Sequence, residues 1–244
     1  YELSGTLGPF KQNIDLRNVN LRGQTFSMLT EKERDDLIEH LRGTKHITSI
    51  NMSNCGMYYD SKRVLAALCN NAELTQIDFS MNGFVMESSV ITVLGEAIDH
   101  HPQLCKLEFR QCPLNSSSSA YAEEFFKTIK KGCIALLDLS NCEVDGKDLQ
   151  FVSDFIADNP TITEINLSGN KLCRWAGLSP GLLSSIRLET LYLNSNAFSN
   201  SPKQQIEEMF ALQTTLHTLD FTGNSFEDPS GLDAIIAKNT TLTC

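Results

Sequence analysis

One short segment of the chain has the letters of a catalytic motif. Residues 177–181 read Gly-Leu-Ser-Pro-Gly, which matches the G-x-S-x-G nucleophile elbow of serine hydrolases. In that elbow, the backbone N–H that follows the serine donates to the oxyanion of the tetrahedral intermediate. Here Ser179 is followed by Pro180, which has no N–H. The segment is also expected beyond a strand, toward an outer helix, so we reject a hydrolase site.

Cysteine and histidine are the other residue types that could bind metal or act as nucleophiles. The chain has eight cysteines and five histidines, but no Cys-x-x-Cys pair and no cysteine–histidine cluster at zinc spacing. It also has no P-loop, dinucleotide-binding fingerprint, HExxH or EF-hand sequence. The sequence therefore predicts no metal, no cofactor and no enzyme activity. We expect the thiols to be reduced, as in a cytoplasmic protein.

The net charge of −10 restricts the partners of the chain. Nucleic acids and anionic membranes carry the same sign and are poor partners. No run of 18 apolar residues is present, so no membrane span is predicted. The expected partner is another protein with a basic or neutral surface.

The elements that would position any site follow from an internal repeat. Seven segments have apolar residues at the first, fourth and sixth places and Asn or Cys at the ninth. They are ITSINMSNCGM (from Ile47), LTQIDFSMNGF (Leu74), LCKLEFRQCPL (Leu104), IALLDLSNCEV (Ile134), ITEINLSGNKL (Ile162), LETLYLNSNAF (Leu188) and LHTLDFTGNSF (Leu216), which start 26 to 30 residues apart. A weaker eighth segment, NIDLRNVNL, fits with Ile14 and Leu16 in frame and Val19 at the ninth place.

Each repeat is predicted to contain one strand and one helix. The alternation at the fourth and sixth places is that of a strand, and the ninth residue can bond backbone groups of the following turn. We expect Cys55, Cys112 and Cys142 to be buried at that ninth place and not to be reactive. Apolar stripes at helical spacing lie between the strands, as at Leu149, Val152, Phe155 and Ile156. Strands sit closer together than helices, so the strands must line the concave side of a curved stack.

This pattern resembles the ribonuclease-inhibitor type of leucine-rich repeat. The resemblance is carried by Asn or Cys at the ninth place, by units near 28 residues and by a full outer helix. It implies an α/β horseshoe solenoid with an inner parallel sheet of about eight strands. The serine-rich segments between strands further resemble bacterial translocated effectors such as those of Legionella, which would place the protein in the host cytosol.

We expect one domain over residues 1–244. It comprises an irregular N-terminal unit at 1–46, seven repeats at 47–241, and the start of a truncated or frayed unit at 242–244.

The frame also predicts which side chains face the concave wall, namely those at the third, fifth and seventh places. In the first unit these are Asn13, Asp15 and Arg17. The candidate partner-binding residues are Asp78, Lys106, Glu108, Arg110, Leu136, Asp138, Glu164, Tyr192 and Asp220. Asp78, Glu108 and Asp138 fall on neighbouring strands and form either an acidic stripe for a basic partner or a simply solvated acidic face. Arg110 either contacts the partner or neutralises the stripe.

Three functions compete at this level, of which the third and least favoured is an enzyme with an unrecognised site. The first is a module that binds a partner protein on its concave face and inhibits or modulates an enzyme by occlusion. The second is a scaffold, or the ligand-sensing repeat segment of a larger receptor or effector. Tyr and Arg are the residue types that most often anchor protein interfaces, which favours Tyr192 and Arg110 as contacts.

Overall fold

The computed structural model describes residues 17–84, 86–114, 120–173, 175–198, 212 and 214–225. Its strands are β1 (Asn18–Asn20), β2 (Ser49–Asn51), β3 (Gln76–Asp78), β4 (Lys106–Glu108), β5 (Leu136–Asp138), β6 (Glu164–Asn166), β7 (Thr190–Tyr192) and β8 (Thr218–Asp220). Its helices are η1 (Phe26–Met28), α2 (Glu31–Gly43), α3 (Ser61–Leu68), α4 (Ser88–His100), α5 (Ala120–Ile129), α6 (Leu149–Asp158), η2 (Trp175–Gly177) and α7 (Ser179–Ser184).

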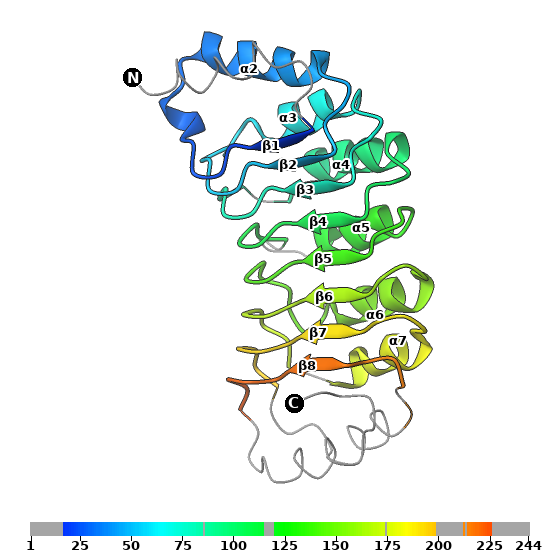
Figure 1. Ribbon diagram of the computed structural model, residues 1–244. Helices are drawn as coiled ribbons and strands as arrows, with labels where there is room; N and C mark the ends of the chain where they lie inside the picture. Colours follow the sequence, from blue (N-terminus) through cyan, green and yellow to red (C-terminus); the bar gives the residue numbers. More distant parts are fainter. Residues whose placement is uncertain are drawn as a thin grey trace.

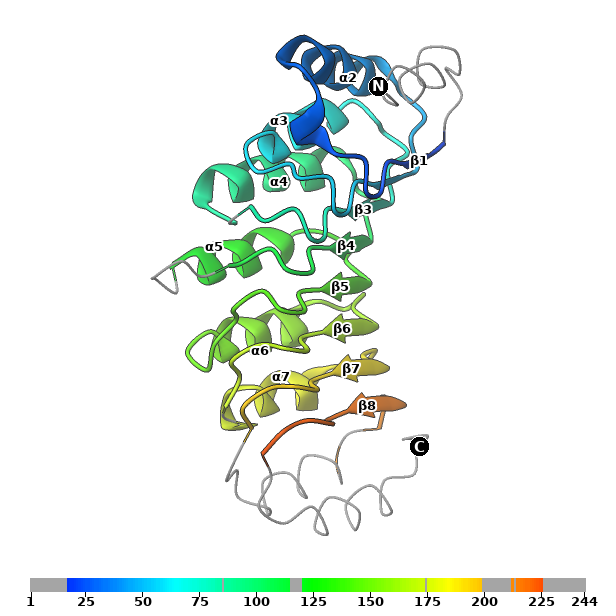
Figure 2. The same cartoon turned by 90° about the vertical axis from the view of Figure 1, so that its left-hand side faces the viewer.

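The strands form one open parallel sheet in chain order, from β1 to β8, with helices in the connections between strands (Figure 1). Figure 2 shows a shallow arc in which the strands lie on the inner side and the helices on the outer side. The predicted α/β solenoid with an inner sheet of eight strands is therefore confirmed. The helices are wider than the strands, and this difference in width bends the stack.

The first strand lies in a different frame from the predicted one. Asn18 pairs with Ser49 and Val19 with Ile50, so Val19 takes the fourth place and not the ninth. The predicted inner residues of this unit are therefore wrong. Asn18 and Asn20 take the third and fifth places, whereas Arg17 lies before the strand and forms an ion pair with Glu73. Asn13 and Asp15 lie outside the described residues.

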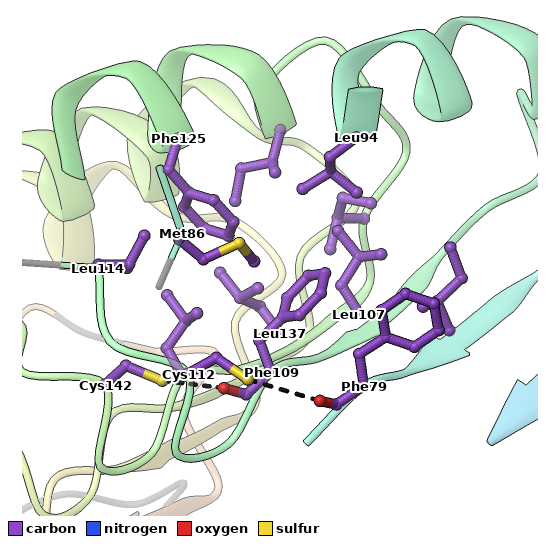
Figure 3. Packing of buried hydrophobic residues seen from close by; sticks show 14 of the residues in the cluster. Phe79, Met86, Leu94, Leu107, Phe109, Cys112, Leu114, Phe125, Leu137 and Cys142 are labelled. Carbon is purple, nitrogen blue, oxygen red and sulfur yellow. Dashed lines mark hydrogen bonds between the residues drawn. The ribbon is translucent and has the colours of Figure 1, made fainter. Parts of the chain in front are cut away.

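One continuous apolar core lies between the sheet and the helices. The fourth- and sixth-place side chains, such as Ile77 and Phe79, are buried in the repeats of β1 to β7, and the predicted helical stripe of α6 is buried against them. In the repeat of β8, Leu219 and Phe221 are partly buried. Phe79, Phe109 and Phe125 make successive edge-to-face contacts, with ring centroids 6.5 and 6.2 Å apart (Figure 3). These contacts couple neighbouring repeats, so no repeat buries its apolar face alone.

The ninth-place residues form a hydrogen-bonded ladder in the turns after the strands. Asn170 donates to the carbonyl oxygens of Leu139 and Leu167, both at 2.9 Å, and accepts from the backbone of Cys142 and Val144, both at 3.0 Å. Cys142 Sγ donates to the carbonyl oxygen of Phe109 at 3.0 Å (Figure 3).

The Asn and Cys side chains of the ninth place thus both donate to the backbone carbonyl oxygen at the sixth place of the preceding repeat. Without this hydrogen bond, the carbonyl group would be buried without a partner. The predicted buried position of Cys55, Cys112 and Cys142 is confirmed. The seven cysteines among the described residues are free thiols.

Candidate functional site

The inner face of the sheet brings the predicted contact residues together. In strand register, Gln76, Lys106, Leu136, Glu164, Thr190 and Thr218 form the third-place row. Asp78, Glu108, Asp138, Asn166, Tyr192 and Asp220 form the fifth-place row. We call these two rows the concave wall. Their side chains alternate with the buried fourth-place residues and are half-buried, except that of Asp78, which is only 7% exposed.

The aspartates of the fifth-place row have a structural role. Oδ1 of Asp138 accepts from the backbone N–H of Ser140 at 2.8 Å, and Asp78 and Asp220 accept in the same way from residues 80 and 222. Asn51 and Asn166 make the same contact in other repeats, so these turns use a short side-chain acceptor and do not need a negative charge. Because Asp78 is nearly covered and used in this way, it offers little to a partner.

Glu108 differs from these aspartates. Its carboxylate makes no turn contact, and its hydrogen bond to a side chain is the one that it accepts from Gln76 Nε2 at 3.3 Å. Asp78 and Asp138 stand directly opposite it on the neighbouring strands. Burial raises the pKa of Glu108, with further contributions from Asp78, Asp138 and Glu164, while Lys106 opposes them. The negative charge of Glu108 therefore lowers the stability of the folded chain.

Four more of the predicted contacts surround Glu108 or extend the wall. Lys106 lies two residues before it on β4, and Leu136 separates Lys106 from Glu164 in the third-place row. Leu136 and Tyr192 are half-buried members of an otherwise polar surface. Lys106 and Glu164 form no ion pair within the described part of the chain.

Arg110 follows Glu108 by two residues and is exposed. Its backbone N–H donates to Ser80 Oγ at 3.1 Å, but its guanidinium forms no hydrogen bond or ion pair with any described residue. Arg110 thus forms no direct ion pair with the acidic stripe in the described part of the chain, and its two expected roles, contact with the partner and neutralisation of the stripe, both stay predictions.

A pocket of about 310 Å³ opens beside Arg110, on the turn side of β4 to β7. It is lined by Arg110, Ser140, Asn141, Asn166, Ser168, Gly169, Tyr192, Asn194 and Ser195. Asn141, Gly169 and Ser195 all take the eighth place and have positive φ angles of 56°, 66° and 55°. Sequence reasoning missed this eighth-place row, although Asn or Gly at this place in four of the seven repeats was a signal for a positive φ.

A second hollow lies away from the sheet, between the start of α3 and the start of α4. It measures about 340 Å³ and includes Tyr58 and Tyr59. These side chains are 59% and 94% exposed, and the ring of Tyr58 lies over Gly83 of the next repeat. Sequence reasoning missed this pair as well, although two adjacent aromatic residues in a connection were a visible signal.

The segment with the letters of a nucleophile elbow lies where it was predicted, on the outer side of the solenoid. Gly177 ends η2 and Ser179 begins α7, with Pro180 in the first turn of that helix. Among the described residues, no group of three His, Cys, Asp or Glu side chains could hold a metal ion. Within the same residues, no helix has the length and apolarity needed to cross a membrane.

No protein-family model matches the chain. Its structure is similar to that of internalin C2 from Listeria monocytogenes, with a TM-score of 0.51 and 15% identity over 85% of this chain and 76% of that one. It is also similar to actin-binding site 2 of leiomodin-1, with a TM-score of 0.41 and 20% identity over 57% of this chain and 82% of that one. The open parallel sheet and the likeness to internalin C2 identify the fold as a leucine-rich-repeat solenoid.

Proposed function

We propose that this chain is a protein-interaction module whose concave wall receives a basic segment of a partner protein. The observation that carries the proposal is Glu108, a half-buried carboxylate between two other carboxylates, without an ion pair among the described residues. The neighbouring aspartates are explained by the turns, but nothing in the fold requires a charge at Glu108.

A partner's Lys or Arg placed over Glu108 would remove the cost of its charge. The ion pair would form on a surface that is already partly desolvated, so it would be stronger than an exposed pair. Glu164 and Asp138 would extend the same attraction along the wall and speed the encounter more than they would strengthen the final complex. Leu136 and Tyr192 would supply the apolar contacts at its margin.

The finer role that we propose is inhibition or modulation of an enzyme by occlusion, as the resemblance to ribonuclease-inhibitor-type repeats implies. Eight strands at about 4.8 Å spacing give an inner arc of about 34 Å, wide enough to cover an active site. A scaffold or ligand-sensing segment would bind its partner on the same wall without inhibiting the partner's activity. A cytoplasmic location and an origin as a bacterial translocated effector remain predictions from the sequence.

The proposal is tested by comparing two variants with the same change in net charge. Glu108→Lys reverses the charge on the wall, and Asp154→Lys does so on the exposed side of α6. A fluorescent tetralysine peptide should bind Glu108→Lys at least several-fold more weakly than Asp154→Lys at low salt, because only the first change lies at the proposed site. Equal binding by the two variants would show that net charge alone attracts the peptide and would refute the assignment to the wall.

Enzyme inhibition needs a separate measurement. Proteins captured by the wild type but not by Glu108→Lys would be assayed with and without the purified chain. Inhibition that is complete at one-to-one stoichiometry supports occlusion, whereas an unchanged activity supports the scaffold.

A further inference from the structure

The pocket beside Arg110 borders the concave wall and is opposite in charge character to the acidic residues of that wall. Among the described residues, Arg110 is the only charged residue that lines it, and no carboxylate does. On a chain with a net charge of −10, this is a local site with a positive side chain and uncharged polar neighbours. Because the guanidinium of Arg110 has no partner among the described residues, it can form a bidentate contact with a ligand.

The floor of the pocket is held by hydrogen bonds among its own side chains. Ser168 Oγ donates to Asn166 Oδ1 at 2.7 Å and also contacts Asn194 Oδ1. Asn166 Nδ2 in turn donates to Asp138 Oδ2 at 3.3 Å. Because the Oδ1 of Asn194 faces Ser168, its Nδ2 remains available as a donor. These contacts fix the pocket before any ligand arrives, which lowers the entropic cost of binding.

The rim of the pocket carries polar groups that are not used within the described chain. The side chains of Asn141 and Ser195 and the hydroxyl of Tyr192 line it, and none makes a hydrogen bond to a described residue. The close approach of Asn141 to the backbone depends on Gly169, where a Cβ would lie 2.3 Å from Asn141 Oδ1. The rim therefore adds amide and hydroxyl donors to the pocket that Arg110 also lines.

We infer that this pocket receives a carboxylate of the partner protein, so that the wall recognises a segment carrying both signs of charge. This inference rests on the proposed function. A guanidinium with neutral donors matches the two oxygens of a carboxylate. A phosphate would double its attraction to Arg110 but also its repulsion from Glu108 and Asp138; because two carboxylates oppose one guanidinium, the singly charged group is favoured.

The spacing of the two recognised charges follows from the strand. Glu108 and Arg110 are two residues apart on the same face, which corresponds to about 7 Å. The matching segment of the partner therefore presents a Lys or Arg and, about 7 Å away, a carboxylate. That carboxylate belongs to an Asp or Glu side chain or to the end of a chain.

The test is a selection from two random-peptide libraries, one with internal peptides and one with free carboxyl ends, against the full chain. The inference predicts peptides that pair a basic residue with an acidic one at a fixed offset, or with the free end in the second library. Selection against Arg110→Gln should lose the acidic position and keep the basic one, and selection against Glu108→Gln should do the reverse. The best peptide should bind Arg110→Gln about tenfold to a hundredfold more weakly than the wild type.

Arg187→Gln is the matched control, because it removes the same charge from an exposed residue outside the pocket. If the peptides carry only basic residues, and Arg110→Gln binds them as well as Arg187→Gln does, the carboxylate pocket is refuted while the basic-segment proposal stands. If the selected peptides bind Glu108→Gln and Arg110→Gln as well as the wild type, both proposals fail. Amidation of a selected free-end peptide separates the two sources, since it abolishes binding only where the chain terminus is the ligand.

Discussion

Replacement of Glu108 by glutamine should make the protein more stable, although it removes a residue that we assign to partner binding. Glutamine has the same shape and keeps the acceptor for Gln76 Nε2. The substitution removes repulsion from Asp78 and Asp138, which stand directly opposite on β3 and β5, and it removes the cost of burying a charge.

The size of the effect follows from these contacts. Like charges opposite each other in a sheet cost about 0.2–1 kcal/mol per pair, and Glu108 has two such neighbours. Lys106 offsets part of this cost, and solvent screens a half-exposed wall. We expect Glu108→Gln to raise the free energy of unfolding at pH 7 by about 0.5–1.5 kcal/mol, which is about 1–5 °C in Tm for a chain of this size.

The pH dependence of stability tests the sign of this effect independently. A carboxyl group whose pKa is raised by folding binds a proton more readily in the folded state, so the destabilising contribution of Glu108 is relieved as pH falls through its folded pKa. The advantage of Glu108→Gln should therefore be complete at pH 7 and vanish below the ordinary carboxyl pKa of 4.5. Added salt should also reduce it.

Urea denaturation at pH 7 and pH 4, each at low and high salt, measures all of these effects. Asp154→Asn on α6 is the control, because it removes one negative charge and keeps the acceptor for Gln150. It should change stability by less than about 0.5 kcal/mol. A Glu108→Gln variant that is no more stable than the wild type at pH 7 and low salt would refute the assignment of an electrostatic cost to Glu108.

Three further predictions concern the frame that holds the wall. Asn170→Ala should lower the free energy of unfolding by about 2–4 kcal/mol in urea denaturation, because four buried backbone groups lose their partner; a loss below about 1 kcal/mol would contradict the ladder. Iodoacetamide at pH 8 should label exposed Cys133 quickly and leave Cys112 unlabelled until the chain unfolds, since burial raises the pKa of Cys112 to about 12; peptide mass spectrometry resolves the two sites. Burial lowers the pKa of His101, whose Nε2 bonds the carbonyl oxygen of Leu68, so the wild type should lose stability as pH falls below about 6.5 while His101→Asn loses less; parallel pH slopes of the two proteins would contradict this.

The sequence alone predicted most of the fold because the repeat frame is a local pattern. Apolar residues at the fourth and sixth places must be buried whatever their neighbours are, and this places the third- and fifth-place residues on the inner face. The same logic placed Cys142 and Asn170 in one buried ladder. These assignments needed only the period of the sequence and the rule that buried polar groups find partners.

The frame of the first strand could not be predicted because its sequence permits two. Ile14 and Leu16 fit the fourth and sixth places, but so do Val19 and Leu21. The pairing of Asn18 with Ser49 places Val19 and Leu21 in the frame. This pairing depends on a strand about 30 residues away. A choice between two equally good local patterns is made by the neighbouring strand.

What each residue of the wall does was likewise decided only by the tertiary structure. In sequence, Asp138 and Glu108 are both acidic fifth-place residues, yet the first is a turn acceptor and the second a charge without an ion pair among the described residues. One extra methylene group makes the difference, because only the shorter side chain reaches the backbone N–H two residues on. The guanidinium of Arg110 has no partner in the part of the chain that the structure describes. The pocket beside it arises from four strands and their turns, so no single repeat of the sequence contains it.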